Sequence, residues 1–189
     1  MENSFFNRDE VKQLGFKKVG DNVYISRKAS FYDIEKISIG NNVRIDDFCI
    51  LSGNITLGSF IHISAHTLLY GKRGIAIDDF SGLSPNVIIF SETDDFCGDY
   101  MIGPMVPERF RNVIGGKVTI KKYIQVGAGC VILPGVTIGE GVAVGSMSLV
   151  TKSLDEWSVY VGIPAKFHKK RQTKLKLMAD DFLKNIHID

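Results

Sequence analysis

Aliphatic residues recur at every sixth position along most of the chain, and this spacing is what most limits the fold. Neither an α-helix, with about 3.6 residues per turn, nor simple strand alternation produces a strict repeat of six. The spacing between ladder residues lengthens by two residues across 71–74. The repeat is interrupted again after Ile89 and resumes at Ile120. The ladder positions are Ile39, Ile45, Leu51, Leu57, Ile63, Leu69, Ile77, Leu83, Ile89, Ile120, Val126, Ile132, Ile138, Val144 and Val150, with a weaker start at Val19, Ile25 and Phe31.

A second position, four residues after each ladder residue, supports the repeat. It holds small or β-branched residues such as Val43, Thr67 and Ser148, which suit an inward position beside a tight turn. Glycine, aspartate or serine often follows the ladder residue directly, and these types accept turn geometry. Six residues thus predict a short strand plus a turn, and three units predict a triangular coil of about 18 residues. We predict an all-β parallel β-helix.

This pattern, [LIV]-[GAD]-x-x-[STAVC]-x, resembles the hexapeptide repeat of the left-handed β-helix acyltransferases. The left hand of the helix comes from that resemblance alone, because the period of six does not define it. The resemblance implies one acyltransferase domain over residues 1–189. Within it we predict an N-terminal cap over 1–18, a β-helix over 19–168 with a loop excursion at 92–117, and a C-terminal helix over 169–189.

Two short helices are predicted outside the repeat. Residues 8–16 suit a helix capped by Asn7 or Asp9 and ended by Gly15. At the C-terminus, apolar residues at helical spacing favour an amphipathic helix, and they are Leu175, Met178, Phe182 and Ile186. That helix either covers the open end of the solenoid or contributes to a cofactor site.

The composition excludes several classes of protein. With 23 Lys+Arg against 21 Asp+Glu, the net charge of +2 shows no nucleic-acid footprint. No apolar stretch approaches the ~18 residues of a membrane span, and the first residues lack the features of a secretion signal. We therefore expect a cytoplasmic protein without nucleic-acid or membrane partners.

Cys49, Cys97 and Cys130 lack CxxC spacing, so we predict neither disulfides nor a metal site. Cys49 and Cys130 occupy inward slots and are predicted to be core.

A second motif, Gly162-Ile163-Pro164-Ala165-Lys166, follows the last coil and is similar to a segment of the same superfamily that lies against coenzyme A. The resemblance implies acetyl-CoA as acyl donor, and a homotrimer with the cofactor between two solenoids. It further implies six cofactor-binding positions, which are Ala128 facing the thioester, Ser146 on pantetheine, Thr151 and Lys152 near the phosphates, and Lys166 and Lys169 near the 3′-phosphate. Basic side chains suit such a ligand electrostatically.

The excursion carries no histidine, although O-acetylating relatives supply a histidine base from such a loop. The block from Phe90 to Glu108, with Leu14-Gly15-Phe16 and Ile45-Asp46-Asp47-Phe48, is similar to a subgroup that N-acylates nucleotide-linked 4-amino-4,6-dideoxyhexoses of the dTDP-viosamine type for O-antigen or capsule assembly. We therefore predict an acetyl-CoA-dependent N-acetyltransferase, with dTDP-4-amino-4,6-dideoxyglucose as acceptor. The alternative is an O-acetyltransferase of the galactoside or maltose type.

An amine acceptor makes the missing histidine tolerable. The pKa of an amino sugar is far lower than that of a hydroxyl, so part of it is unprotonated at working pH. We assign Glu92 to hold the amine and accept a proton, directly or through water, with Ser84 and Thr93 as hydrogen-bonding companions. Alternatively, the departing thiolate takes the proton and the protein mainly positions the substrates. Asp94 and Asp95 either bind sugar hydroxyls or cap the turn of the excursion through its backbone. His66, which we expect to point outward, is placed on the substrate side.

Two further functions are less consistent with the sequence. Some proteins of this fold are zinc carbonic anhydrases, which need three convergent histidines, whereas only His62 and His66 lie on coils. A non-enzymatic scaffold would need neither the Gly-x-Pro-Ala-Lys motif nor the long acidic excursion.

Overall fold

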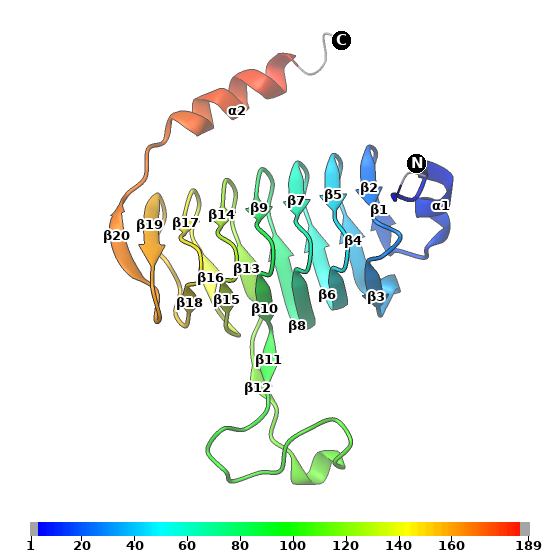
Figure 1. The fold of residues 1–189 in the computed structure, drawn as a ribbon, viewed down its shortest axis with the longest axis vertical. Coiled ribbons are helices and arrows are strands. Elements are labelled where there is room, and N and C mark those ends of the chain that lie inside the picture. The colour runs from blue at the N-terminus through cyan, green and yellow to red at the C-terminus, as the bar shows by residue number, and fades with distance from the viewer. Residues whose placement is uncertain (1–3, 186–189) are drawn as a thin grey trace.

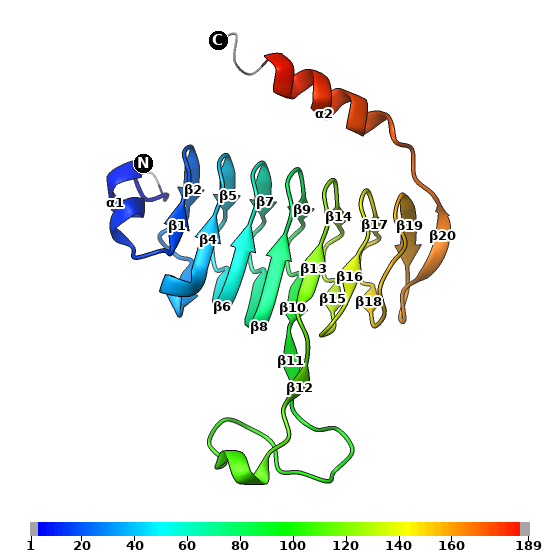
Figure 2. The same ribbon diagram turned by 180° about the vertical axis from the view of Figure 1, so that it is seen from behind.

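The chain forms a parallel β-helix in a computed structural model that describes residues 4–185 (Figures 1 and 2). One face is an eight-stranded sheet, parallel apart from its last pair, of β2 (Val23–Ile25), β5 (Val43–Ile45), β7 (Ile61–Ile63), β9 (Gly82–Leu83), β14 (Gln125–Val126), β17 (Ala143–Val144), β19 (Ser158–Val161) and β20 (Lys166–Lys170).

The other two faces form a ten-stranded sheet because the long strands β6 and β8 run through both. Its strands are β1 (Lys18–Val19), β3 (Ser30–Tyr32), β4 (Ile37–Ile39), β6 (Ile50–Leu57), β8 (Leu68–Ile77), β10 (Ile88–Phe90), β13 (Val118–Ile120), β15 (Val131–Ile132), β16 (Thr137–Ile138) and β18 (Leu149–Val150).

The predicted ladder forms the core. Leu51, Leu69, Ile89, Ile132 and Val150 pair in register across successive coils and are all fully buried. Each coil thereby stacks its aliphatic residue on that of the next, and parallel hydrogen bonds satisfy the backbone between them. The two-residue slip at 71–74 stays within the continuous strand β8, whose pairing with β6 shifts register between Gly53 and Ile55.

The coils turn at three corners, which we name by their contents. The serine corner comprises the turns 46–49, 64–67, 84–87, 127–130 and 145–148, and includes left-handed residues such as His66 (φ 61°) and Asn86 (φ 60°). The aromatic corner carries Phe60, Phe80, Tyr123 and Trp157, also left-handed, as a run of neighbouring rings. The third, the excursion corner, is where residues 91–117 leave the solenoid.

The excursion contains short regular elements, whereas its sequence predicted only a loop. β11 (Glu92–Thr93) and β12 (Ile114–Gly115) pair as an antiparallel stalk, and a 3-10 helix, η2 (Glu108–Phe110), lies beyond it. Figure 1 shows the excursion projecting away from the coils on this stalk.

The N-terminal helix is shorter than the predicted 8–16. Helix α1 (Arg8–Gln13) begins at Arg8 and is capped by Asn7, whose side chain and backbone form a capping box with Glu10. It ends early because Gly15 takes a φ of 93°, which an α-helix cannot continue. A further 3-10 turn, η1 (Ile34–Lys36), precedes β4.

The C-terminal helix also differs from its predicted range of 169–189. Residues Lys166–Lys170 form β20 instead, because the exposed edge of β19 offers hydrogen bonds to an antiparallel strand. Helix α2 (Lys174–Asn185) follows, and Ile186, expected on its apolar stripe, lies outside the described residues. The ring of Phe182 lies 5.4 Å from that of Phe60, so α2 runs along the aromatic corner and does not cover the open end.

Candidate functional site

Several predicted site residues lie in one line along the serine corner. Ser84, Ala128 and Ser146 occupy successive coils there, because Pro85 accepts a hydrogen bond from the backbone of Gly129 (3.0 Å) and Ala128 accepts one from Met147 (2.8 Å). The glycine before Ala128 is required by this stacking, since a Cβ on Gly127 would lie 2.5 Å from the backbone nitrogen of Ser146. Predicted catalytic and cofactor-binding positions are therefore neighbours on this edge.

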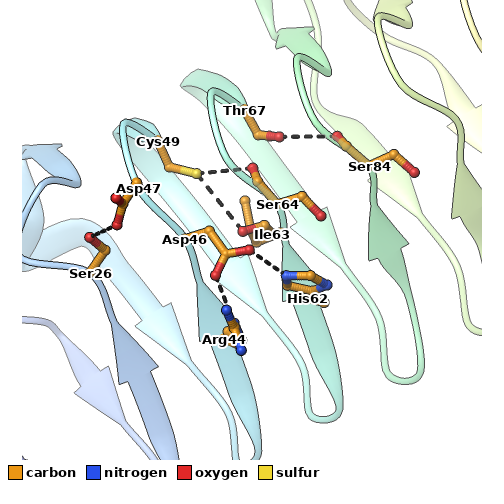
Figure 3. A network of polar contacts seen from close by, with 10 residues as sticks. All are labelled: Ser26, Arg44, Asp46, Asp47, Cys49, His62, Ile63, Ser64, Thr67 and Ser84. Atoms are coloured by element: carbon orange, nitrogen blue, oxygen red, sulfur yellow. Dashed lines mark hydrogen bonds and ion pairs between the residues drawn. The ribbon is translucent and has the colours of Figure 1, made fainter. Parts of the chain in front are cut away.

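Ser84 is held firmly in place. Its backbone N–H donates to the carbonyl of Val126 (2.9 Å), and its own carbonyl accepts from the hydroxyl of Thr67 (3.3 Å; Figure 3). Its hydroxyl oxygen lies 3.2 Å from Nε2 of Gln125.

The turn between β19 and β20 is fastened to the same corner. Gly162 donates its N–H to the hydroxyl of Ser148 (3.0 Å), and Ala165 donates to the carbonyl of Leu149 (2.8 Å). Lys166 therefore starts β20 beside the C-terminal end of the serine corner. Lys169 lies further along, where it lines a cavity of about 490 Å³ with Arg171 and others.

Thr151 and Lys152 lie elsewhere, at the excursion corner. Both are exposed and follow β18, so one strand separates them from Ser146. A ligand that touched both groups would have to cross the face formed by β18.

The excursion corner holds a second group of predicted residues around a cavity of about 790 Å³. Its lining combines aromatic, basic and acidic side chains: Tyr70, Lys72, Arg73, Phe90, Glu92, Thr93, Asp94, Pro104, Glu108, Arg111 and Val113. The rings of Tyr70 and Phe90 stack with centroids 5.4 Å apart and planes at 10°. An aromatic surface with three cations beside it suits a ligand with a base and a diphosphate.

Glu92 is engaged by cations. Its Oε2 lies 3.3 Å from Nε of Arg73 and its Oε1 lies 3.9 Å from Nζ of Lys72. Arg73 in turn donates to the carbonyl of Val113 (2.6 Å), on the other side of the stalk. Glu92 and Arg73 therefore tie the two sides of the base of the excursion together.

The two neighbouring aspartates differ in what they contact. Asp95 accepts hydrogen bonds from the backbone of Gly98 (2.8 Å), Asp99 (3.0 Å) and Tyr100 (3.4 Å), the turn-capping role of the two predicted alternatives. Burial acts to raise the pKa of Asp95, but these backbone donors outweigh it and lower the pKa. Asp94 accepts from the backbone of Gly103 (3.2 Å) and also lines the cavity.

The histidines of the coils are exposed. His66 stacks on Phe48 with centroids 5.0 Å apart. His62 lies 2.7 Å from Asp46, which also accepts from Arg44 (2.7 Å; Figure 3). Burial acts to raise the pKa of Asp46, yet hydrogen bonds from Arg44 and His62 hold it below its ordinary value. Within residues 4–185, no three histidine, cysteine or acidic side chains are placed to bind a metal ion.

Two of the three cysteines are core, as predicted. The thiol of Cys49 is buried and lies 3.2 Å from the carbonyl of Ser64, and burial raises its pKa to about 11. Burial likewise raises the pKa of Cys130, whose thiol lies 3.1 Å from the carbonyl of Gly145. Neither thiol is suited to act as a nucleophile.

The predicted catalytic residues (Ser84, Glu92 and Thr93) and the predicted substrate-binding residues therefore fall into two places within one chain. Ser84 and His66 lie at the serine corner, whereas Glu92, Thr93 and Asp94 lie at the excursion corner, and strand β10 separates the two. Sequence reasoning did not single out Gln125, Arg73 or the Tyr70–Phe90 stack. The stack had a signal, because each aromatic directly follows a ladder residue, Leu69 or Ile89.

No helix among the described residues is long and apolar enough to span a membrane. No protein-family model matches the chain. The dTDP-4-amino-4,6-dideoxy-D-glucose acyltransferase of Escherichia coli is 42% identical over 175 residues, which cover 91% of each protein. The galactoside O-acetyltransferase of Lactococcus lactis is 29% identical over 117 residues, 62% of this chain and 53% of that protein.

Solved structures of AntD, an N-acyltransferase from Bacillus cereus, are similar over their whole length. The complex of its S84C variant with dTDP-4-amino-4,6-dideoxyglucose and coenzyme A is 50% identical, with a TM-score of 0.96, and covers 98% of this chain and 100% of AntD. Another contains dTDP and 3-hydroxybutyryl-CoA. Further structures are of the variants S84A, S84T, D94A and D94N.

These likenesses agree with the resemblance found in the hexapeptide repeat and in the excursion. The predicted β-helix, acyltransferase activity and coenzyme A donor are thereby confirmed at the level of the family. The chain belongs to the dTDP-4-amino-4,6-dideoxyglucose acyltransferases, within the hexapeptide-repeat acyltransferases.

Proposed function

We propose that this protein transfers an acetyl group from acetyl-CoA to the 4-amino group of dTDP-4-amino-4,6-dideoxyglucose. The observation that carries the proposal is the full-length likeness to AntD, whose complexes contain this sugar nucleotide and coenzyme A. The amine attacks the thioester carbonyl, a C–N bond forms, the C–S bond breaks, and the departing thiolate can accept the proton of the ammonium. The protein then contributes chiefly alignment and oxyanion stabilisation.

The excursion cavity is the proposed sugar-nucleotide site. The Tyr70–Phe90 stack offers a plane for the thymine, and Arg73 and Arg111 offer donors for the diphosphate. Asp94 lines this cavity, and it shares its number and residue type with the AntD position that was varied. We assign Asp94 to the sugar, and Asp95 to the turn.

The serine corner is the proposed path of the cofactor. Ala128 and Ser146 would contact pantetheine through the main chain, and Lys166 and Lys169 would lie near the phosphates. Because β10 separates this corner from the excursion cavity, we propose a homotrimer in which the excursion of one protomer completes the serine corner of the next. This arrangement would also bring Thr151 and Lys152 of one protomer to the cofactor of another.

The proposal is tested with purified protein, acetyl-CoA and dTDP-4-amino-4,6-dideoxyglucose, following thiol release and the mass of the product. We expect turnover with this acceptor and none with dTDP-glucose, which carries a hydroxyl in place of the amine. Acetylation of a galactoside but not of the amino sugar would favour the O-acetyltransferase alternative. Comparison of acetyl-CoA with 3-hydroxybutyryl-CoA tests the acyl group.

A further inference from the structure

We propose that Gln125 is a positioning residue, which sets the direction in which the hydroxyl of Ser84 donates its hydrogen. The inference rests on the proposed function, since it concerns how Ser84 would serve the acyl transfer. Gln125 lies in β14, on the coil after Ser84, and 41 residues separate the two in sequence.

The amide of Gln125 has a defined orientation. Its Nε2 lies 3.2 Å from Oγ of Ser84 and 3.5 Å from the carbonyl oxygen of Val126. A carbonyl oxygen can only accept, so the NH2 group and not the amide oxygen must face this side. Oγ of Ser84 is therefore the acceptor, and its single hydrogen is left for another partner.

A glycine makes this arrangement possible. Gly82 lies directly opposite Gln125 in the sheet. A Cβ on Gly82 would lie 3.3 Å from Oε1 and 3.8 Å from Nε2 of Gln125, so the amide lies over the space that a side chain would fill. Gln125 is itself exposed, and burial therefore does not require it to bond to Ser84.

Among residues 4–185, Gln125 is the hydrogen-bond partner of this hydroxyl, so its hydrogen is available to a bound ligand. The backbone of Ser84 is fixed on both sides by Val126 and Thr67, and the neighbouring coil carries Ala128, the position expected to face the thioester. A hydroxyl that donates to the thioester oxygen binds it more strongly as that oxygen gains negative charge. We infer that Gln125 holds Ser84 in this donor state.

Gln125→Glu tests the inference because a carboxylate has nearly the same size but can only accept. The hydroxyl of Ser84 then donates to residue 125 and is lost to the substrate. We expect kcat to fall about 10- to 100-fold with both KM values within about threefold of wild type. Gln125→Ala, which frees the hydroxyl, should cost less, about 3- to 10-fold. Arg44→Ala, an outward change on the same sheet, is the matched control and should keep wild-type kcat.

Two readouts separate positioning from a structural role. The activity of Gln125→Glu relative to wild type should recover at low pH, where the introduced carboxyl is protonated and can donate again. In a Ser84→Ala background, Gln125→Glu should add no further loss, because the group it redirects is absent. Wild-type kcat in Gln125→Glu, a larger loss in Gln125→Ala, or an equal loss without Ser84 would each overturn the inference.

A crystal structure of Gln125→Glu gives a readout independent of substrate. We expect the contact from Oγ of Ser84 to shorten from 3.2 Å to about 2.6 Å, as for a hydroxyl that donates to a carboxylate. A side chain turned away from Ser84 would refute the proposal. If wild type acylates a different acceptor, the proposed function fails, and the variant ratios measured with that acceptor still decide the role of Gln125.

Discussion

At the scale of single residues, Glu92 makes contacts that its sequence did not predict. The sequence left open whether this carboxylate or the departing thiolate accepts the proton of the substrate amine. In the structure Arg73 and Lys72 lie within 4.0 Å of its two oxygens, so its negative charge serves the base of the excursion.

We expect Glu92→Gln to lower kcat by about tenfold or less, because the amide keeps one hydrogen-bond acceptor. Removal of a general base would instead lower kcat roughly 10²–10⁴-fold. Steady-state kinetics across pH checks this, and the rising limb of kcat/KM should survive since it follows the sugar ammonium. If kcat fell by more than 100-fold and the rising limb of kcat/KM disappeared, Glu92 would be identified as the general base. A thousandfold loss in His66→Asn would instead favour a histidine-based transferase.

The ladder residues show how strongly single positions determine stability. Ile132 is fully buried between Ile89 and Val150. Ile132→Asp should lower the free energy of unfolding by more than about 3 kcal/mol, because it buries a carboxyl within the aliphatic core. Ile132→Val should cost only about 0.5–1.5 kcal/mol. Thermal unfolding of both variants tests the assigned register, which an unchanged Tm for the aspartate would contradict.

At the scale of elements, the excursion depends on the Asp95 turn. The pKa of Asp95 is lowered in the folded state, so its carboxylate stabilises the turn above the ordinary carboxyl pKa of 3.8. That contribution is lost as the pH falls through the lower, folded-state value. The amide resonances of Gly98 and Asp99 should therefore titrate together with a midpoint below 3.8. Asp95→Ala should abolish the titration and speed hydrogen exchange at both amides, and a midpoint above 3.8 would be inconsistent with the cap.

Two of the lysines proposed to meet the cofactor lie apart in the chain, since Lys166 begins β20 and Lys152 follows β18. Lys152→Ala and Lys166→Ala should each raise the KM for acetyl-CoA about 3- to 10-fold while the KM for the sugar nucleotide changes little. The difference should shrink toward about 0.5 M NaCl, because salt screens exposed charges. Lys18→Ala, at the other end of the solenoid, is the control. An effect confined to the sugar KM would assign these lysines to the other substrate.

At the scale of the whole molecule, the proposed homotrimer would join the two separate groups of predicted site residues across protomers. Sedimentation should give three times the chain mass of 21.0 kDa. Ser84→Ala and Asp94→Ala should each be impaired, yet trimers assembled from both should regain activity, because some sites then pair an intact Ser84 with an intact Asp94. A mixture no more active than the separate variants would show that both residues serve from one chain.

The sequence by itself determined the β-helix and its core. A ladder residue can be recognised within a single six-residue unit, because every unit repeats the same short strand with one buried aliphatic position. For that reason the ladder positions from Ile39 to Val150 were predicted as core, and all of them are buried. The Gly-x-Pro-Ala-Lys motif and the excursion block likewise indicated the family.

Tertiary structure decided which outward side chains meet. The slip at 71–74 and the excursion make the coil length irregular, so spacing does not reveal that Gln125 lies opposite Gly82 and beside Ser84. It also does not reveal that Arg73 reaches Val113 across 40 residues, or that α2 returns along the aromatic corner. Outward positions show no hydrophobic pattern that identifies their neighbours, because almost any side chain is tolerated where it is exposed to solvent. Their contacts depend on how whole coils stack.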